Sequence, residues 1–317
     1  MVNIAIAGGG SNVASEVIDV LCAAQKHDIL LLSRKDAPKE ESRAGVRWAK
    51  TNYQDIDELV KLLDGVHTLL SFTNFQPDSG AISQRNLVDA SIRAGVMRFA
   101  PSEWALLHLE HTPWYAGKIE TRKYLEQVNK DKKTLEYCIF VPGLFTNYFT
   151  YPYPSADRLS LFELHIDFNN RRALGVEGDE DARITLTTVQ DFANIVGKSV
   201  EYEGEWPVIG GIKGTELSVA ELLAIGEKVR GGQFKTERLK AEDLKAGKVN
   251  GSWLPTVGHH SVSPEQWKAF AAVMNAGMLQ ATAAGALNVS DEWNRLLPDY
   301  KCTQAGDFLA ESWRGKS

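Results

Sequence analysis

A glycine-rich turn close to the amino terminus holds the residues with the clearest chemical meaning. Directly after a short apolar run, the sequence contains Gly8-Gly9-Gly10-Ser11-Asn12-Val13-Ala14. Glycines between a strand and a helix let the backbone come close to a pyrophosphate, and the free N–H groups of the helix start favour an anion. The spacing follows the G-x-x-G-x-x-G pattern, with Ser11 and Ala14 in the second and third glycine places. The turn therefore predicts a dinucleotide site whose phosphate contacts come from Gly8, Gly10, Ser11, Asn12 and Val13.

The residues after the second apolar run indicate which dinucleotide is bound. A site for NAD needs a carboxylate here to accept from the ribose hydroxyls, but the sequence has Ser33, Arg34 and Lys35. Arginine can bind a phosphate through two parallel hydrogen bonds, and lysine adds a point charge. These residues predict a 2′-phosphate site and hence NADPH or NADP⁺. The alternative is a solvated charged loop, because Asp36 and Glu40 follow.

The first half of the chain alternates short apolar runs with amphipathic helical patterns, which is typical of a parallel sheet built from βαβ units. Strands are expected at 3–8, 28–33, 46–50, 66–72, 97–100 and 137–141. Helices are expected at 13–24, 56–63, 82–94 and 114–128. The last of these helices has Thr112 as its expected cap and Pro113 at its first position.

The second half is less regular. Residues 147–154 have the aromatic and proline content of a loop, and a helix is expected at 187–200 and a strand at 206–210. Two further helices are expected at 218–229, capped by Ser218, and at 263–286, with Pro264 at its first position. We expect residues 1–150 to form the nucleotide-binding domain, with 187–211 returning to it. Residues 151–186 and 212–317 are then expected to form a second lobe.

Length and composition exclude several classes of protein. The 317 residues suffice for roughly two domains, and 44% hydrophobic with 24% charged residues is typical of a globular chain. A net charge of −6 argues against a nucleic-acid partner. No apolar run approaches the roughly 18 residues of a membrane span, so no membrane partner is expected. Three widely spaced cysteines favour reduced thiols and a cytoplasmic location.

Two histidine pairs and one acidic stretch have residue types that bind metals. His108 and His111 are three residues apart, and His259 and His260 are adjacent, but no cysteine or pair of carboxylates completes either set. The acidic residues 177–181 lack the spacing of an EF-hand. We therefore expect no bound metal.

Three longer motifs show a family resemblance. They are the run 94–104 (AGVMRFAPSEW), the pair Tyr115 and Lys118 three residues apart, and the run 142–148 (PGLFTNY). Together with the glycine turn and Ser33-Arg34, they resemble the NmrA-like family, in its isoflavone-reductase-like branch of the atypical short-chain dehydrogenases. The closing residues 297–299 and 308–309 are similar to fungal members, so the resemblance spans nearly the whole chain.

The resemblance implies an α/β fold, with a Rossmann-like doubly wound parallel sheet that binds NADP and a smaller α+β lobe for the substrate. Catalytic members of the family reduce C=C, C=N or C–O bonds with the help of a helical lysine, whose place is taken here by Lys118. Its ammonium can bind the nicotinamide ribose and protonate the substrate, and Tyr115 lies on the same helical face. The tyrosine of the common Tyr-x-x-x-Lys pattern is absent, because Trp114 occupies its position.

The same comparison implies further site residues. Ser71, Phe72 and Thr73 are expected to line the cofactor after the fourth strand, with Asn52 near the adenine. The residues expected beside the nicotinamide are Pro142, Gly143 and Phe145. An apolar pocket for an aromatic substrate is expected from Trp104, Tyr148, Phe149 and Trp253, since ligand pockets are mostly apolar. Ser102 is expected to make a structural turn.

Three hypotheses about function follow. The first is an NADPH-dependent oxidoreductase that reduces a C=C or C=N bond of a bulky aromatic or alkaloid-like natural-product intermediate, with Lys118 assisting proton transfer. The second is an NADPH-using cyclase, in which reduction is followed by stereocontrolled ring closure. The third is a regulator that binds NADP(H) without turning it over. The sequence leaves open whether the protein is a monomer or a homodimer.

Overall fold

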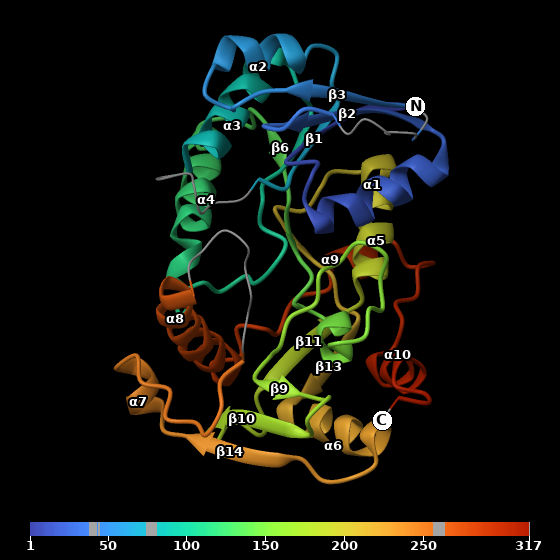
Figure 1. The fold of residues 1–317 in the computed structure, drawn as a ribbon. Coiled ribbons are helices and arrows are strands. Elements are labelled where there is room, and N and C mark those ends of the chain that lie inside the picture. The colour runs from blue at the N-terminus through green and yellow to red at the C-terminus, as the bar shows by residue number, and fades with distance from the viewer. Residues whose placement is uncertain (38–42, 44, 74–80, 256–263, 317) are drawn as a thin grey trace.

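A parallel six-stranded sheet forms the upper part of the molecule (Figure 1). Its strands are β1 (Val2–Ala7), β2 (His27–Ser33), β3 (Val46–Lys50), β4 (Thr68–Ser71), β5 (Arg98–Ala100) and β6 (Glu136–Tyr137). The order is β3-β2-β1-β4-β5-β6, and every neighbouring pair is parallel. Strands β2 and β3 therefore extend the sheet on one side of β1, and β4, β5 and β6 extend it on the other, so the strand order reverses between β1 and β4. Doubly wound sheets bind their ligands at such a point, outside the carboxyl ends of the strands.

The structure is a computed structural model. It describes residues 1–37, 43, 45–73, 81–255 and 264–316, and for residues 264–270 it describes the backbone without the side chains.

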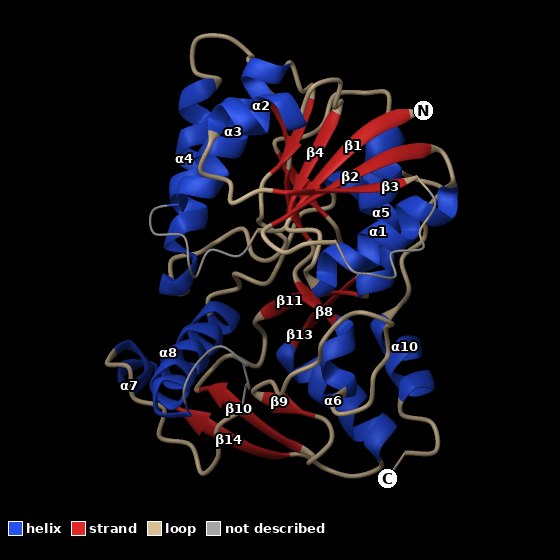
Figure 2. Ribbon diagram, turned by 45° about the horizontal axis from the view of Figure 1, so that its top comes forward, coloured by secondary structure: helices blue, strands red, loops and turns tan. Residues whose placement is uncertain are grey.

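Five helices cover the sheet: α1 (Asn12–Ala24), α2 (Ile56–Leu62), α3 (Ile82–Ala94), α4 (Ala116–Val128) and α5 (Val189–Glu201). Helices α1 and α5 pack together on one face, and α2, α3 and α4 cover the other (Figure 2). The predicted α/β, Rossmann-like doubly wound fold is confirmed.

The sequence of β1 explains why the sheet is covered on both faces. Ile4 and Ile6 belong to the apolar core under α1 and α5, whereas Ala5 and Ala7 belong to the core on the opposite face. Successive side chains of a strand point to opposite faces, so the unbroken apolar run of residues 4–7 has to be buried on both faces. All four residues are at most 1% exposed.

Residues that follow the sixth strand in the sequence also belong to this upper part. Strand β7 (Ile139–Val141) pairs in parallel with β12 (Ile209–Gly211), and α5 packs on α1. Short helix α9 (Glu292–Leu296) lies against β12, where added side chains at Gly210 and Gly211 would collide with Trp293 and Ser290. The predicted domain boundaries stay a prediction, which the pairing of residues 209–211 with β7 supports.

The lower part holds two three-stranded sheets and several helices. The strands are β8 (Leu144–Phe145), β9 (Ile166–Asp167), β10 (Arg172–Val176), β11 (Arg183–Thr187), β13 (Thr215–Ser218) and β14 (Lys235–Leu239). The sheet orders are β14-β10-β9 and β13-β11-β8. The helices are α6 (Val219–Arg230), α7 (Ala241–Lys245), α8 (Pro264–Ala283) and α10 (Ala305–Ser312). The predicted cap of α6 is confirmed, because Ser218 accepts from the backbone of Glu221, which bonds back to Ser218.

Several element boundaries differ from those expected. The run 137–141 is not one strand, because it divides at Cys138 between β6 and β7. The helix expected from residue 187 begins only at Val189, since residues 183–187 pair in β11 and Thr188 is the cap. The strand expected at 206–210 begins at Ile209, and α8 ends at Ala283, earlier than predicted.

Two shorter expectations are also corrected. Thr112 does not cap the fourth helix, because its hydroxyl donates to the carbonyl of Leu109 at 3.0 Å. Residues 113–115 form a 3₁₀ turn (η2), and α4 starts after it. Residues 146–150, expected to be mostly loop, form another 3₁₀ helix (η3). In the described part of the chain no helix has the length and apolarity needed to cross a membrane.

Candidate active site

The glycine turn lies between the carboxyl ends of β1 and β4. Gly8 has a φ of +74°, and a Cβ there would come within 2.6 Å of the Phe72 carbonyl oxygen, so the close approach of the backbone after β4 requires glycine. Gly10 is exposed, and a Cβ there would meet no atom within 4 Å. Ser11 caps α1 by accepting from the N–H of Ala14 at 3.2 Å. The turn thus presents an open backbone at the start of α1, which suits an anion.

The other two turn residues have different surroundings. The Asn12 amide donates to the hydroxyl of Ser160, which connects the start of α1 to the lower part of the molecule. Val13 is half-buried and packs on the core beneath α1.

The tyrosine after β3, which sequence reasoning missed, supports this turn. Tyr53 is 2% exposed and has a φ of +62°, and its hydroxyl donates to the Leu32 carbonyl at 2.7 Å and accepts from Gly8 N–H at 2.9 Å. Burial raises the pKa of this phenol to about 12, so it remains a donor. The predicted residue Asn52 is exposed, and its side-chain oxygen accepts from the backbone of Gln54 at 2.9 Å.

The two cations after β2 are exposed, next to the glycine turn. Ser33 is buried, and its hydroxyl accepts from the N–H of Lys35 at 3.0 Å, which fixes the turn. The nearby acid Asp36 pairs with Lys50 at 2.8 Å instead of with Arg34 or Lys35. Neither cation has an ion pair among the residues that the structure describes. Two exposed cations without a carboxylate partner favour a phosphate site over the alternative, a charged loop whose opposite charges pair with one another.

A buried glutamine connects the end of β4 to the segment after β5. The Gln84 amide nitrogen donates to the hydroxyls of Ser71 at 2.5 Å and Thr73 at 2.6 Å, and its oxygen accepts from the Ser102 N–H at 3.2 Å. The Ser102 hydroxyl donates to the Thr73 carbonyl at 2.9 Å, which agrees with the turn expected there. Phe72 points away from this network and stacks on Trp104, with ring centroids 4.4 Å apart.

Lys118 lies on α4 beside this segment and is only 5% exposed. Its ammonium donates to the backbone carbonyls of Ser102 at 2.7 Å and Glu103 at 2.5 Å, and it lies 4.6 Å from the ring centre of Tyr115. Burial lowers the pKa of this ammonium to about 8, because removal from water disfavours the charged form. An amine of that pKa can hold or release a proton near neutral pH.

The segment expected beside the nicotinamide follows β7 at the same edge. Pro142, Gly143 and Phe145 are all buried. Gly143 has a φ of +72°, and a Cβ there would lie 2.5 Å from the carbonyl oxygen of Thr185, so only glycine fits without movement. The Phe145 ring lies 5.9 Å from that of Tyr148.

Among the four aromatic residues expected to bind substrate, Tyr148 interacts with Tyr115. Tyr148 packs on Phe162 at 4.3 Å and joins the same apolar cluster as Tyr115. Burial raises the pKa of both phenols, and Tyr115 adds to the effect on Tyr148. Both groups therefore stay protonated and can donate hydrogen bonds.

Two of the other three aromatics share an apolar cluster with Tyr148, namely Trp104 and Phe149, whereas Trp253 does not. Trp104 stacks between Phe72 and Phe140 in the core under α1 and α5. Phe149 is 3% exposed in the core of the lower part. Trp253 packs in a different cluster, with the guanidinium of Arg172 3.9 Å from its ring centre. The structure does not bring these four aromatic residues together into one pocket.

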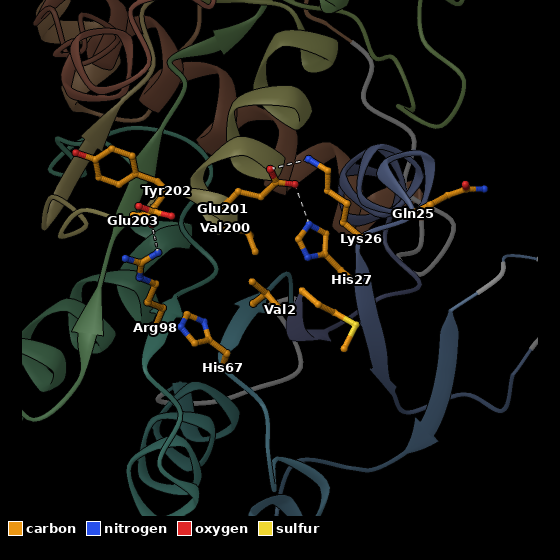
Figure 3. A pocket seen from close by; sticks show the side chains of 11 residues that line it. Val2, Gln25, Lys26, His27, His67, Arg98, Val200, Glu201, Tyr202 and Glu203 are labelled. Atoms are coloured by element: carbon orange, nitrogen blue, oxygen red, sulfur yellow. Dashed lines mark hydrogen bonds and ion pairs between the residues drawn. The ribbon is translucent and has the colours of Figure 1, made fainter.

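A pocket of about 750 Å³ opens at the opposite edge of the sheet, where His27, His67 and Arg98 lie near the amino ends of the strands (Figure 3). Its charged groups interact with one another. Glu201 contacts Lys26 at 3.1 Å and His27 at 3.2 Å, and Arg98 donates to a carboxylate and two backbone carbonyls. Because parallel sheets bind ligands at their carboxyl edge, this pocket is not the candidate active site.

No cluster of three histidine, cysteine or acidic side chains suited to a metal occurs within the described ranges. His108 lies 3.9 Å from Glu110. His259 and His260 lie outside the described residues.

Comparisons with known proteins bear on the family and the fold of this chain. The sequence matches the NmrA-like family over residues 2–257. Oxidoreductase BOA1 of Botryotinia fuckeliana is 26% identical over 313 residues, which cover 97% of this chain and 100% of that protein. The NADPH-dependent quinone oxidoreductase QOR2 of Escherichia coli, solved with NADPH, aligns with a TM-score of 0.68 at 21% identity, over 98% of each chain. Citrobacter sp. triphenylmethane reductase, solved with NADP(H), aligns with a TM-score of 0.69 at 18% identity, over 98% of this chain and 99% of that one.

The two solved structures share the fold of this chain, and the family match extends over most of its length. The resemblance seen in the sequence motifs is thereby confirmed: this protein belongs to the NmrA-like family.

Proposed function

We propose that this protein is an NADPH-dependent oxidoreductase that reduces a bulky aromatic or alkaloid-like small molecule. The observation that carries the proposal is the position of Lys118. Its buried ammonium is bonded to the Ser102 carbonyl, and Ser102 is joined through Gln84 to the end of β4, where the family places the cofactor. The names of the compared proteins support a reductase, because each is an oxidoreductase or a reductase.

The residues at the carboxyl edge fit NADPH. The open backbone at Gly10 and the start of α1 can receive the pyrophosphate, and Arg34 and Lys35 can receive the 2′-phosphate. Pro142, Gly143 and Phe145 are the residues that we assign to the nicotinamide. When bound, NADPH supplies the hydride for the reduction.

The chain's own residues then have three tasks. Lys118 holds a proton in a site away from bulk water and can deliver it to the substrate atom that gains negative charge. The protonated phenols of Tyr115 and Tyr148 can orient a polar group of the substrate by donating to it. Apolar rings around Tyr148 restrict water and suit an aromatic ligand.

The direct test follows NADPH oxidation by the purified protein with a panel of quinones and cationic triphenylmethane dyes, and with NADH as the matched control. We expect turnover with at least one bulky aromatic acceptor and a strong preference for NADPH. Tight binding of NADPH without turnover on any acceptor would favour the regulator hypothesis and overturn this proposal. A ring-closed product would identify the cyclase, whereas an unrearranged reduced product would identify the reductase.

The pH dependence of turnover tests the role of Lys118. Because its pKa is about 8, the ammonium form is dominant below this value and lost above it. We expect kcat to be level near pH 6 to 7 and to fall by about tenfold per pH unit well above pH 8. Lys118→Arg keeps a cation that does not titrate in this range, so its lower kcat should lack this decrease. A wild-type kcat that stays level to about pH 10 would exclude Lys118 as the proton donor.

The contact of Tyr53 with the glycine turn leads to another prediction. Tyr53→Phe removes the hydroxyl that bonds Gly8 and Leu32 but retains the ring, so we expect the Kd for NADPH to rise about 3- to 10-fold. Fluorescence titration measures this change. Tyr124→Phe is the control, because it removes a phenol that bonds Asp89 outside the proposed site. Equal effects of the two substitutions on the Kd would contradict a specific role for Tyr53.

A further inference from the structure

A second, partly buried cation lies one helical turn after Lys118. Arg122 donates from two nitrogens to the same carboxylate oxygen of Glu103, at 2.6 and 3.1 Å. Its guanidinium also donates to the backbone carbonyls of Leu106, at 2.9 Å, and Leu107. The carboxylate of Glu103 is almost fully enclosed, with 2% of its side chain exposed. A buried ion pair of this kind costs desolvation, so it is poor evidence for a contribution to stability.

Lys118 holds the same segment from the preceding turn of α4. It binds the carbonyls of Ser102 and Glu103, while Arg122 binds the Glu103 carboxylate and the carbonyls further along. Glu103 is therefore shared, since its backbone contacts one cation and its side chain contacts the other. Residues three or four apart lie on one face of a helix, which explains why both cations reach this segment.

The surroundings of the Lys118 ammonium place two opposite charges near it. Glu103, from the segment after β5, raises the pKa of Lys118, and Arg122, from its own helix, lowers it. Two further titratable groups face this part of the site: Tyr115 at the start of α4 and Tyr148 from η3. Burial raises the pKa of both phenols, so they are uncharged in the working range of pH. Burial is the largest influence on the pKa of Lys118, and the opposite charges of Glu103 and Arg122 then act on it from two sides.

We propose that Glu103 and Arg122 are positioning residues, which fix the ammonium of Lys118 and balance its charge inside the buried site. The Arg122 contacts hold residues 102–107 against α4, which keeps the two carbonyls in place to bind the ammonium. The negative charge of Glu103 favours the protonated form of Lys118. The positive charge of Arg122 disfavours that form and so opposes the effect of Glu103. The consequence for turnover rests on the proposed function, in which Lys118 donates the proton.

The test compares Glu103→Gln, Arg122→Met and the double variant. Glu103→Gln is nearly isosteric and keeps the backbone carbonyl, so only the negative charge is lost. We expect the Lys118 titration midpoint to move down by about one pH unit in Glu103→Gln and up by a similar amount in Arg122→Met. The double variant should lie between the two single variants. If the ion pair had only a structural role, its loss would destabilise the fold in both single variants, and the Lys118 midpoint would not move in opposite directions in the two.

The midpoint can be measured without a substrate. Competitive labelling with acetic anhydride over a range of pH, read residue by residue by mass spectrometry, reports the free amine of Lys118. The exposed Lys123 on the same helix is the internal control, and its labelling should not change between variants. An unchanged or raised midpoint in Glu103→Gln would overturn the proposal by itself, even if Arg122→Met failed to fold.

The kinetic measurement separates the two proposals. If the labelling midpoint and the pH at which kcat declines both move down in Glu103→Gln, both proposals are supported. A shift in labelling without a shift in the kcat profile would contradict the role of Lys118 as proton donor, but would leave the positioning role of Glu103 and Arg122 intact. No shift in labelling would contradict the positioning role alone.

Discussion

Lys118→Met is expected to lower kcat for NADPH-dependent reduction by about 100-fold or more, because general acid catalysis of this kind contributes about 10²- to 10⁴-fold. The substitution keeps most of the apolar stem but removes the ammonium that binds the carbonyls of Ser102 and Glu103. The glycine turn and the cations after β2 are untouched, so the Kd for NADPH should change far less than kcat. Rapid-mixing kinetics and a separate binding titration measure the two effects independently.

Lys118→Arg is the matched control for charge. Arginine restores the cation beside Glu103, so folding and cofactor binding should be closer to those of the parent protein. Because a guanidinium does not release its proton near neutral pH, kcat should remain low. If either variant kept kcat within about threefold of the parent value, Lys118 would have no part in proton transfer.

The second large effect is expected at the cations after β2. The double substitution Arg34→Ser with Lys35→Ser should raise the Kd for NADPH by about 100-fold, since each charge-assisted hydrogen bond to a phosphate contributes roughly 1.5–3 kcal/mol. The Kd for NADH should change by less than about twofold, because NADH lacks the 2′-phosphate. Isothermal titration of both cofactors measures this selectivity.

A control for net charge is available on the same protein. Lys130→Ser with Lys132→Ser removes the same number of positive charges from an exposed turn after α4. This variant should keep the parent Kd for NADPH. Equal losses of NADPH affinity in the two double variants would indicate a general electrostatic effect instead of a phosphate site at Arg34 and Lys35.

The sheet and the glycine turn could be predicted from sequence because their signals are local. The alternation of apolar runs with helical patterns reflects burial of both faces, as Ile4 and Ala5 show by entering opposite cores. The capping box of α6 is also local, since both partners lie within four residues. By contrast, Thr112 had the residue type of a cap but bonded the preceding turn, a choice that depends on the path of the chain before α4.

The aromatic pocket could not be predicted for a different reason. An aromatic residue has the same apolar surface whether it contacts a ligand or a core, so composition did not separate Tyr148 from Trp253, which packs in another cluster. Tyr53 was missed because its hydroxyl reaches a turn 45 residues away, through a left-handed backbone that the sequence does not reveal. The Glu103–Arg122 pair likewise depends on contacts between residues 19 positions apart.

A crystal structure of the protein with NADP⁺ would show directly whether the carboxyl edge of the sheet holds the cofactor next to Lys118. We expect the pyrophosphate at Gly10 and the start of α1, and the 2′-phosphate in contact with Arg34 or Lys35. We also expect the nicotinamide ribose within hydrogen-bond distance, about 3 Å, of the Lys118 ammonium. A cofactor bound at another edge of the sheet, or a nicotinamide that leaves Lys118 out of contact, would refute the proposed site.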